Sequence, residues 1–257
     1  MPRLGYTRYV AQGGDVGAAV TDVVGRQAPE DLLGIHMNRF VPALINPGAF
    51  SAEFEEERAA ADAINAFRTT GKASLIEQDT RPQTIGYALL DSPIALAAWM
   101  LDHDTDAYDK ISSAFVAGKP SGNLTRDHIF DDITTYWLTG TGASAARSYW
   151  EGAQAGAAAA AAGQAPPPVP VGFTTFPGEI WRTPRSWVEQ AYPTLTNFNN
   201  ADRGGHFAAW EEPELFATPS SGPHPGRFVS CRVRAGWMPL LAGEAERLNF
   251  EPLGTPS

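Results

Sequence analysis

The sequence predicts an α/β fold in which helices cover a parallel sheet. Strand-like residues at Tyr9–Ala11 and Leu32–Met37 flank a segment, Ala19–Val24, whose alanines and valines recur at helical spacing. A strand, a tight turn, a helix and a second strand within about thirty residues form a βαβ unit, and the two strands of such a unit are parallel. The tight turn is the glycine-rich pentapeptide Gly13–Gly17, and Pro29 ends the helical segment.

A long helical segment interrupts the predicted sheet between about Asn46 and Gln164. Glu53–Phe67 has the pattern of a charged amphipathic helix, and Ser92-Pro93 starts another, with serine as the cap and proline in the first turn. A third helix follows Leu124–Asp127. The alanine-rich stretch Gly152–Gln164 is either the end of a helix or a flexible linker.

Strand-like patterns resume after the helical segment. Val169–Phe173 and Thr194–Phe198 are predicted strands, and the polar loop Asn199–Gly205 follows the second of them. Between the two strands, Thr183-Pro184 predicts the start of a helix that runs to Ala191, with Thr183 as its cap and Pro184 at its first position.

The composition is that of a globular protein and disfavours several classes of partner. The 257 residues are 43% hydrophobic and 19% charged, and the formal charge of −10 argues against non-specific binding to nucleic acid or to anionic lipid. One cysteine, Cys231, excludes an internal disulfide framework and a cysteine-based zinc site.

No segment has the pattern of a membrane span or of a secretory signal. The best apolar stretch, Ser92–Leu101, is shorter than the roughly 18 residues that cross a bilayer, and Asp91 and Asp102 bracket it. Met1–Gln12 has no apolar core after its arginines. We therefore expect a cytoplasmic protein with no nucleic-acid or membrane partner, and we leave a homo-oligomer open.

Asp15 stands where the first strand meets the first helix, with glycines on both sides. Such a position is a sharp elbow that projects its side chain, and glycines are expected there because the backbone is crowded and partly at positive φ. The N-terminus of the following helix stabilises negative charge, which suits a carboxylate nucleophile or a developing oxyanion. The alternative, from the pentapeptide alone, is an aspartate that caps the helix.

Glu179 and His206 complete a set of three residues. Glu179 follows the predicted strand Val169–Phe173, and His206 lies on a glycine loop after the predicted strand Thr194–Phe198. Each residue taken alone has a simpler interpretation: Glu179 as a solvated carboxylate, and His206 as a histidine of a surface loop. Together with Asp15 they give the chain order nucleophile, acid, histidine, which is the order of the α/β-hydrolases.

Five segments closely resemble the epoxide hydrolases of the microsomal type. They are Leu4–Asp15, Thr80–Leu89, Asp91–Pro93, Tyr136–Thr141 and Arg203–Glu214, and they occur in order over roughly residues 4 to 217. The resemblance implies an α/β-hydrolase fold, with a parallel sheet and a helical cap, and hydrolysis of an epoxide to a vicinal diol. It implies no metal and no organic cofactor. The implied partners are a small hydrophobic epoxide and water.

The resemblance also implies a division of the chain. Residues 1–45 would form the core around the nucleophile, residues 46–165 the cap, residues 166–218 the part of the core with the acid and the histidine, and residues 219–257 an irregular tail. The family carries a His-Gly-x-Pro segment and several core strands before its nucleophile strand. We therefore expect that the N-terminal strands and half of the oxyanion hole are missing, and that the chain alone is poorly stable or inactive.

Residue roles follow from the resemblance, position by position. Asp15 would attack an epoxide carbon and form an ester, His206 would activate water to hydrolyse that ester, and Glu179 would orient the imidazole. The separation of 206 − 179 = 27 residues agrees with the family and favours Glu179 over the other nearby glutamates, Glu189, Glu211 and Glu212. The backbone N–H of Val16 would serve the oxyanion hole.

The acid that protonates the epoxide oxygen is implied less completely. The family uses two cap tyrosines, and Tyr149 occupies one of these positions, with Tyr136 and Tyr87 as alternatives. The second tyrosine is expected three residues before Glu77, where this chain has Ser74. A serine hydroxyl is shorter and much less acidic than a phenol, so this position departs from the family's pair of tyrosines.

Two other functions stay open on the sequence. One is a haloalkane dehalogenase-like hydrolase, although Val16 replaces the tryptophan that binds the halide in those enzymes. The other is a catalytically impaired fragment or a non-catalytic α/β-hydrolase-like protein, which Ser74 and the irregular tail favour. The acidic run Asp102–Asp106 has consecutive residues at a helix end, so we interpret it as a solvated turn and not as a metal site.

Overall fold

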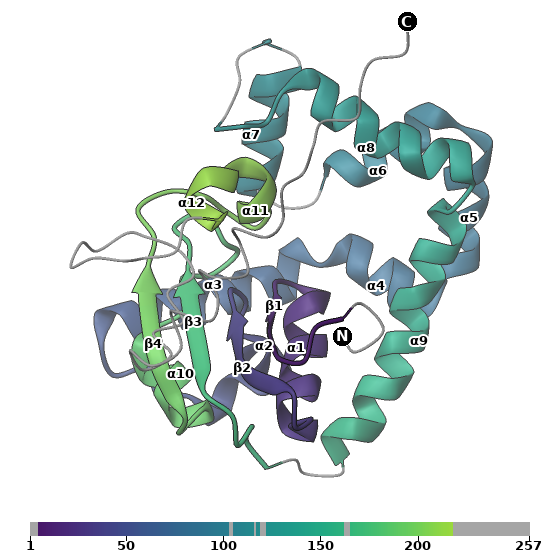
Figure 1. Ribbon diagram of the computed structural model, residues 1–257. Helices are drawn as coiled ribbons and strands as arrows, with labels where there is room; N and C mark the ends of the chain where they lie inside the picture. Colours follow the sequence, from purple (N-terminus) through teal and green to yellow (C-terminus); the bar gives the residue numbers. More distant parts are fainter. Residues whose placement is uncertain (1–4, 103–104, 116, 119–121, 162–164, 218–257) are drawn as a thin grey trace, which may run out of the picture.

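The computed structural model describes residues 5–102, 105–115, 117–118, 122–161 and 165–217 (Figure 1). The predicted irregular tail, residues 219–257, and Cys231 within it lie outside these residues, as do His103 and Asp104 of the acidic run.

Four parallel strands form the sheet within the described residues, in the order β1-β2-β3-β4. They are β1 (Tyr9–Gly13), β2 (Leu32–Met37), β3 (Val171–Thr175) and β4 (Leu195–Asn200). Helix α1 (Val16–Gln27) connects β1 to its parallel neighbour β2, so the predicted βαβ unit is confirmed. Because all four strands run the same way, their carboxyl ends meet at one edge of the sheet, where α/β proteins place their ligand sites.

Helices fill the chain between β2 and β3, as the sequence predicts, and the described residues there contain no strand. The elements are α2 (Val41–Ile45), η2 (Pro47–Ala49), α3 (Glu55–Ala66), η3 (Phe67–Gly71, a π-helical turn), α4 (Ala73–Thr80), α5 (Pro82–Asp91), α6 (Pro93–Leu101), α7 (Thr105–Phe115), α8 (Arg126–Thr139) and α9 (Gly142–Ala161). Three short helices follow β3: α10 (Arg185–Ala191), α11 (Ala208–Glu211) and α12 (Pro213–Ala217). The alanine-rich stretch therefore continues α9 as far as residue 161.

Local caps fix the ends of several of these helices, and the cap at Ser92 is the one that the sequence predicts. The Ser92 hydroxyl accepts a hydrogen bond from the Ala95 N–H at 3.2 Å, and the Thr125 hydroxyl accepts one from the His128 N–H at 3.3 Å. Each bond satisfies an N–H group that has no acceptor within its own helix. Helix α8 ends at Gly140, whose φ of +61° is a conformation that glycine adopts without strain.

Two boundaries differ from the sequence prediction because tertiary contacts override local preference. Thr183 does not cap α10: the N-cap position is Pro184, and the buried Thr183 instead donates its N–H to the Thr175 hydroxyl at 2.9 Å. The predicted polar loop at Asn199 and Asn200 is the end of β4, because these residues pair with Thr174 and Thr175 of β3.

The described residues contain three separate apolar clusters, and two of them are large. One packs the sheet against α1, α3 and α10 around Ile35, Phe173 and Trp187. The other joins α5, α6, α7, α8 and α9 through residues such as Leu96 and Ile133. Figure 1 shows α5 to α8 grouped beyond the arrowheads of β3 and β4, while α9 runs back along the side of the sheet. The helices of the predicted cap thus have an apolar core of their own, although the boundaries at 46 and 165 stay predictions.

We predict that Phe173→Ala lowers the free energy of unfolding by about 3–5 kcal/mol, the usual cost of truncating a buried phenylalanine. Phe173 is fully buried in β3, and its ring stacks on that of Phe198 at 5.9 Å. Urea unfolding followed by tryptophan fluorescence measures the change. Phe54→Ala is the matched control, because Phe54 is 65% exposed and its truncation should change stability by less than about 0.5 kcal/mol. Equal effects of the two truncations would contradict this packing.

Candidate active site

Asp15 lies on a strained elbow between β1 and α1. Its backbone has φ +46° and ψ −123°, a region that residues with a Cβ rarely adopt. A Cβ at Gly13 would lie 2.0 Å from the Gly17 carbonyl oxygen, and one at Gly14 would lie 2.7 Å from the Asn38 Oδ1. Gly17 itself has open space, so crowding explains Gly13 and Gly14 only. The Asp15 side chain makes no capping hydrogen bond to α1, which contradicts the alternative of a helix cap.

The loops that carry Glu179 and His206 are joined to each other. Gly178 donates its N–H to the Gly204 carbonyl at 3.0 Å, and Gly178 and Gly205 form a parallel bridge. Gly204 has φ +94°, and a Cβ there would lie 2.8 Å from the Phe176 ring, so this position requires glycine. The bridge continues the parallel pairing of β3 and β4 into the loops that follow them. It therefore brings Glu179 and His206, which directly follow Gly178 and Gly205, to the same edge of the sheet.

The structure brings Asp15, Glu179 and His206 into one chain of contacts. The His206 Nδ1 lies 2.8 Å from the Glu179 Oε1, and the His206 Nε2 lies 3.2 Å from the Asp15 Oδ2. The side chains of His206 and Glu179 are almost fully buried, whereas that of Asp15 is 44% exposed. An open carboxylate at the end of a buried acid–imidazole pair has the geometry of a nucleophile with its base.

Opposing influences act on the pKa of the imidazole. Burial lowers the pKa of His206, but the hydrogen bonds to Asp15 and Glu179 outweigh it, so that the pKa rises from 6.5 to about 9. The positive charge of Arg39 lowers the pKa of His206. In the described structure, with Asp15 as a free carboxylate, the ring therefore holds its second proton at neutral pH.

Arg39 is a residue of this site that the sequence analysis did not identify. It lies two residues after the end of β2, its side chain is 6% exposed, and its Nη1 lies 3.3 Å from the Glu179 Oε1 and 3.2 Å from the His206 Nδ1. A signal was available: a charged residue within two positions of the carboxyl end of a buried parallel strand lies at the edge where ligands bind.

Tyr149 and Ser74 line a small cavity next to Asp15. The cavity has a volume of about 80 Å³, and its walls are formed by Asp15, Arg39, Phe67, Gly71, Ser74, Leu75, Gln78, Tyr149 and Ile180. Burial, and then the negative charge of Asp15, raise the pKa of Tyr149, so that its hydroxyl keeps its proton and can donate it. Tyr87 is 68% exposed and does not line this cavity.

Val16 is the first residue of α1, and its side chain is 59% exposed. The first N–H groups of a helix have no acceptor within the helix and point out of its N-terminus. The position next to Asp15 therefore suits a backbone donor and places no demand on the side chain. The oxyanion role of Val16 stays a prediction.

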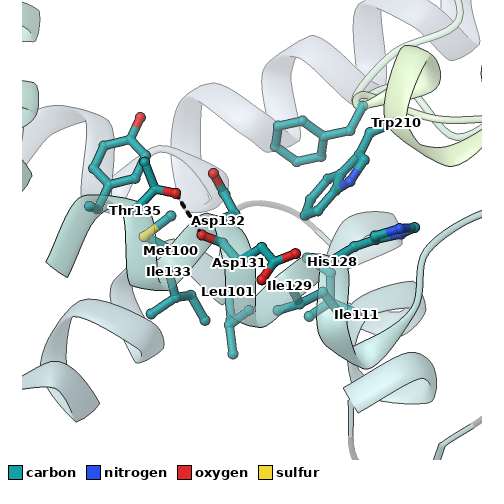
Figure 2. Close-up of a pocket in the computed structure, with 12 residues that line it drawn as sticks. Met100, Leu101, Ile111, His128, Ile129, Asp131, Asp132, Ile133, Thr135 and Trp210 are labelled. Carbon is teal, nitrogen blue, oxygen red and sulfur yellow. Dashed lines mark hydrogen bonds between the residues drawn. The ribbon is translucent and has the colours of Figure 1, made fainter. Parts of the chain in front are cut away.

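A larger cavity of about 660 Å³ lies among α6, α7, α8 and α11 (Figure 2). Its wall contains Met100, Leu101, Ile111, His128, Ile129, Asp131, Asp132, Ile133, Thr135, Tyr136, Phe207 and Trp210. Tyr136 therefore belongs to this wall and not to the cavity at Asp15. Phe207 directly follows His206, and the two rings meet edge to face at 4.9 Å. The residue that follows His206 thus forms part of the wall of the larger cavity.

The described residues contain neither a membrane-spanning helix nor a cluster of metal ligands. None of their helices combines the length and the apolar character needed to cross a membrane. No three His, Cys, Asp or Glu side chains within the described ranges lie close enough together to hold a metal ion.

The raised pKa of His206 predicts a pH-dependent stability. An imidazole with a higher pKa in the folded protein than in the unfolded chain stabilises the fold fully below about 6.5 and loses this contribution as the pH rises through about 9. The difference in unfolding free energy between the wild type and His206→Gln should therefore shrink by on the order of 3 kcal/mol between about pH 6 and about pH 10. Urea unfolding at both pH values measures it, and a constant difference would contradict the ion pairing.

Comparison with known proteins gives several related proteins, although no family model matches the chain. It is 44% identical over 219 residues to a candidate epoxide hydrolase of Stigmatella aurantiaca (strain DW4/3-1), which covers 84% of this chain and 47% of that protein. It is 32% identical over 233 residues to Epoxide hydrolase 1 of Sus scrofa, covering 84% of this chain and 51% of that protein. The chain spans about half the length of the curated relatives it matches.

Solved structures of epoxide hydrolases have the same fold. The juvenile hormone epoxide hydrolase of Bombyx mori superposes with a TM-score of 0.66 and 25% identity, covering 84% of this chain and 54% of the other. The epoxide hydrolase of Aspergillus niger superposes with a TM-score of 0.60 and 30% identity, covering 83% of this chain and 51% of the other. The predicted α/β-hydrolase fold is therefore confirmed, and the chain is a homologue of the epoxide hydrolases of the α/β-hydrolase type.

Proposed function

We propose that this chain carries the catalytic residues of an epoxide hydrolase that works through an ester on Asp15. The observation that supports this proposal is the chain of contacts from Glu179 through His206 to Asp15, at 2.8 Å and 3.2 Å. Asp15 is the partly exposed member of the three, so it alone is open to a substrate. The names of the homologues point to the same reaction.

In the first step a carboxylate oxygen of Asp15 attacks one ring carbon of the epoxide. The bond from that carbon to the ring oxygen breaks, and the oxygen takes a proton from the Tyr149 hydroxyl. The products are an ester of Asp15 with a free neighbouring hydroxyl group and a tyrosine that must regain its proton. A carboxylate needs no base for this attack, because it is ionised at neutral pH by its ordinary pKa.

In the second step the imidazole of His206 takes a proton from water, and the hydroxide adds to the Asp15 carbonyl carbon. The tetrahedral intermediate then expels the diol oxygen, which takes the proton back from the imidazolium. Asp15 is left as a carboxylic acid with one oxygen from water, and its proton returns to the oxygen of Tyr149, so that the carboxylate and the phenol are both restored. The backbone N–H of Val16 would donate to the oxygen that becomes negative in the intermediate.

The electrostatics of the site suit this order of steps. With Asp15 as a carboxylate, the pKa of His206 is raised to about 9. Esterification neutralises Asp15 and removes one of the hydrogen bonds that raise this pKa, so the ring can release its proton. The imidazole therefore becomes a base at the stage of the reaction that needs one.

The walls of the site favour an apolar epoxide. Phe67, Leu75 and Ile180 line the cavity at Asp15. The larger cavity that reaches Phe207 is mostly apolar, with Asp131 and Asp132 among its polar groups. Ser74 faces the same small cavity as Tyr149, so one phenol and one serine hydroxyl are available to the epoxide oxygen there. The substrate proposed is a small hydrophobic epoxide, with water as the second reactant.

The ester predicts a mass adduct when its hydrolysis is blocked. His206→Gln incubated with styrene oxide should gain the mass of one epoxide on Asp15, measured by intact-protein mass spectrometry and located by peptide mapping. The wild type should accumulate less adduct, because His206 activates the water that removes it. Asp15→Asn is the matched control, since asparagine tolerates the positive φ of the elbow but lacks the nucleophile.

The absence of an adduct from folded His206→Gln would contradict the ester mechanism. An adduct that also forms on Asp15→Asn would show alkylation elsewhere and would contradict the assignment of Asp15. Circular dichroism on each variant establishes that it is folded.

Loss of the Tyr149 hydroxyl should slow the opening of the epoxide. General acid catalysis contributes about 10²–10⁴-fold, so Tyr149→Phe should lower the rate of ester formation within this range. Ser74→Ala should lower it by less than about threefold if the phenol is the acid. Tyr87→Phe, on the exposed face of α5, is the matched control. Stopped-flow quenching of tryptophan fluorescence measures ester formation, and a larger effect of Ser74→Ala would reverse the assignment.

A further inference from the structure

The guanidinium of Arg39 lies between the two carboxylates of the site. Its Nη1 is 3.3 Å from the Glu179 Oε1, and its Nε is 3.8 Å from the Asp15 Oδ1. It also stacks over Trp181, with 4.8 Å between the guanidinium carbon and the ring centroid. Arg39 is thus fixed on one side by an aromatic face and on the other by both acids.

The Glu179 carboxylate has an unusual environment for a buried charge. Its Oε1 accepts from the Ile180 N–H at 2.9 Å and lies within reach of His206 and Arg39, while its Oε2 is buried with no hydrogen-bond partner among the described residues. A buried carboxylate is costly unless a positive charge compensates it. Two cations are within reach, the permanent one of Arg39 and the imidazolium of His206.

We propose that Arg39 is a positioning residue of the water-activating step: its guanidinium supplies the permanent positive charge for Glu179, so that the imidazole of His206 is free to be neutral. This inference rests on the proposed function, because only the hydrolysis of the Asp15 ester needs a neutral imidazole. Once Asp15 is esterified, Arg39 and Glu179 remain as a charge-balanced pair beside the ring.

The geometry separates this role from direct catalysis. The shorter contact of His206 Nδ1 is with Glu179, at 2.8 Å, and the contact with Arg39 is 3.2 Å. The Nδ1–H therefore points to Glu179, which leaves Nε2 directed at Asp15 and the attacking water. Arg39 lies near Nδ1, the ring nitrogen that does not face Asp15. It acts on the ring through its charge and through the position of Glu179. Its charge is one of the causes that lower the pKa of His206.

Other charged groups near the ring come from several elements. Asp15 precedes α1, Glu179 follows β3, and Arg39 follows β2. Tyr149 of α9 lines the cavity at Asp15. The negative charges of Asp15 and of Asp79 in α4 both raise the pKa of Tyr149. On the His206 side, Glu211 of α11 is paired with Lys110 of α7. Among these groups Arg39 is the cation that touches both Glu179 and His206.

The proposal is tested by the titration of His206 with and without the charge at residue 39. Protein labelled with ¹⁵N-histidine is titrated by NMR, and the His206 signal among the five histidines is assigned with His206→Gln. The wild-type midpoint is expected at about 9. Arg39→Met removes the charge and should raise the midpoint by about one unit or more, whereas Arg39→Lys keeps the charge and should stay within about half a unit of the wild type.

A second measurement follows the reaction. In single turnovers with styrene oxide, the ratio of the rate of ester hydrolysis to the rate of ester formation should fall about tenfold in Arg39→Met, because one unit of pKa leaves about tenfold less neutral imidazole. Arg39→Lys should restore most of this ratio. Arg182→Met is the matched control: Arg182 is exposed next to Trp181, and its loss should change neither the midpoint nor the ratio.

Three outcomes would overturn the proposal. They are an unchanged His206 midpoint in folded Arg39→Met, an Arg39→Lys that titrates like Arg39→Met, and an equal shift in Arg182→Met. If Arg39→Met does not fold, Arg39→Gln, which keeps a donor for Glu179 without the charge, is judged by the same midpoint. A shifted midpoint without any ester in His206→Gln would support the electrostatic role of Arg39 and contradict the proposed function, so the two failures are distinguishable.

Discussion

The contact between His206 and its two carboxylates depends on the parallel arrangement of the sheet. Asp15 follows β1, Glu179 follows β3, and His206 follows β4, and parallel strands deliver these residues to one edge. Local features then complete the alignment. The elbow at Asp15 turns its side chain toward the imidazole, and the bridge between Gly178 and Gly205 holds the other two loops together. Asp15 and His206 are 191 positions apart in the sequence, and it is the parallel arrangement of the strands that brings them into contact.

Charge balance is the second constraint, and it links stability to chemistry. Two carboxylates, one imidazole and one guanidinium share a site in which three of the four side chains are buried. In the state described, the imidazole holds an extra proton because Asp15 and Glu179 attract it more strongly than burial and Arg39 repel it. A reaction that neutralises Asp15 reverses this balance. The arrangement that stabilises the protein as described is therefore also the one that would prepare the imidazole as the base of the proposed second step.

Local signals were enough to predict the elements around Asp15, but not the contacts that complete the site. The strand Leu32–Met37 is observed with the predicted bounds, and the predicted cap at Ser92 forms, since each depends on residues close in sequence. Thr183 and the end of β4 were wrongly predicted because their backbone groups bond to β3, a segment that local patterns do not specify. Arg39 has no motif at all. Its role depends on Glu179 and Trp181, both about 140 residues away.

The position of the proposed acid is set by a different part of the fold from that of the nucleophile. Tyr149 lies on α9, which packs on α4 and α5, whereas Asp15 and His206 belong to the sheet and its loops. The two groups meet at the small cavity that they line together with residues of η3 and α4. Contacts between the helical part and the segment that follows His206 add a second link between the two parts.

Glu211 makes such contacts. It is buried, its carboxylate accepts from the Phe207 N–H at 3.1 Å and pairs with Lys110 of α7, and its carbonyl accepts from the Asn123 N–H at 2.7 Å. The sequence offered Glu211 as a competitor of Glu179 for the role of acid partner. The structure instead uses its carboxylate to tie Phe207, the residue after His206, to Lys110 of α7, while its carbonyl contacts the segment at Asn123. A buried pair of this kind is sensitive to the loss of either partner, so the position of the segment next to His206 depends on a charge pair that lies outside the three contacting residues Asp15, Glu179 and His206.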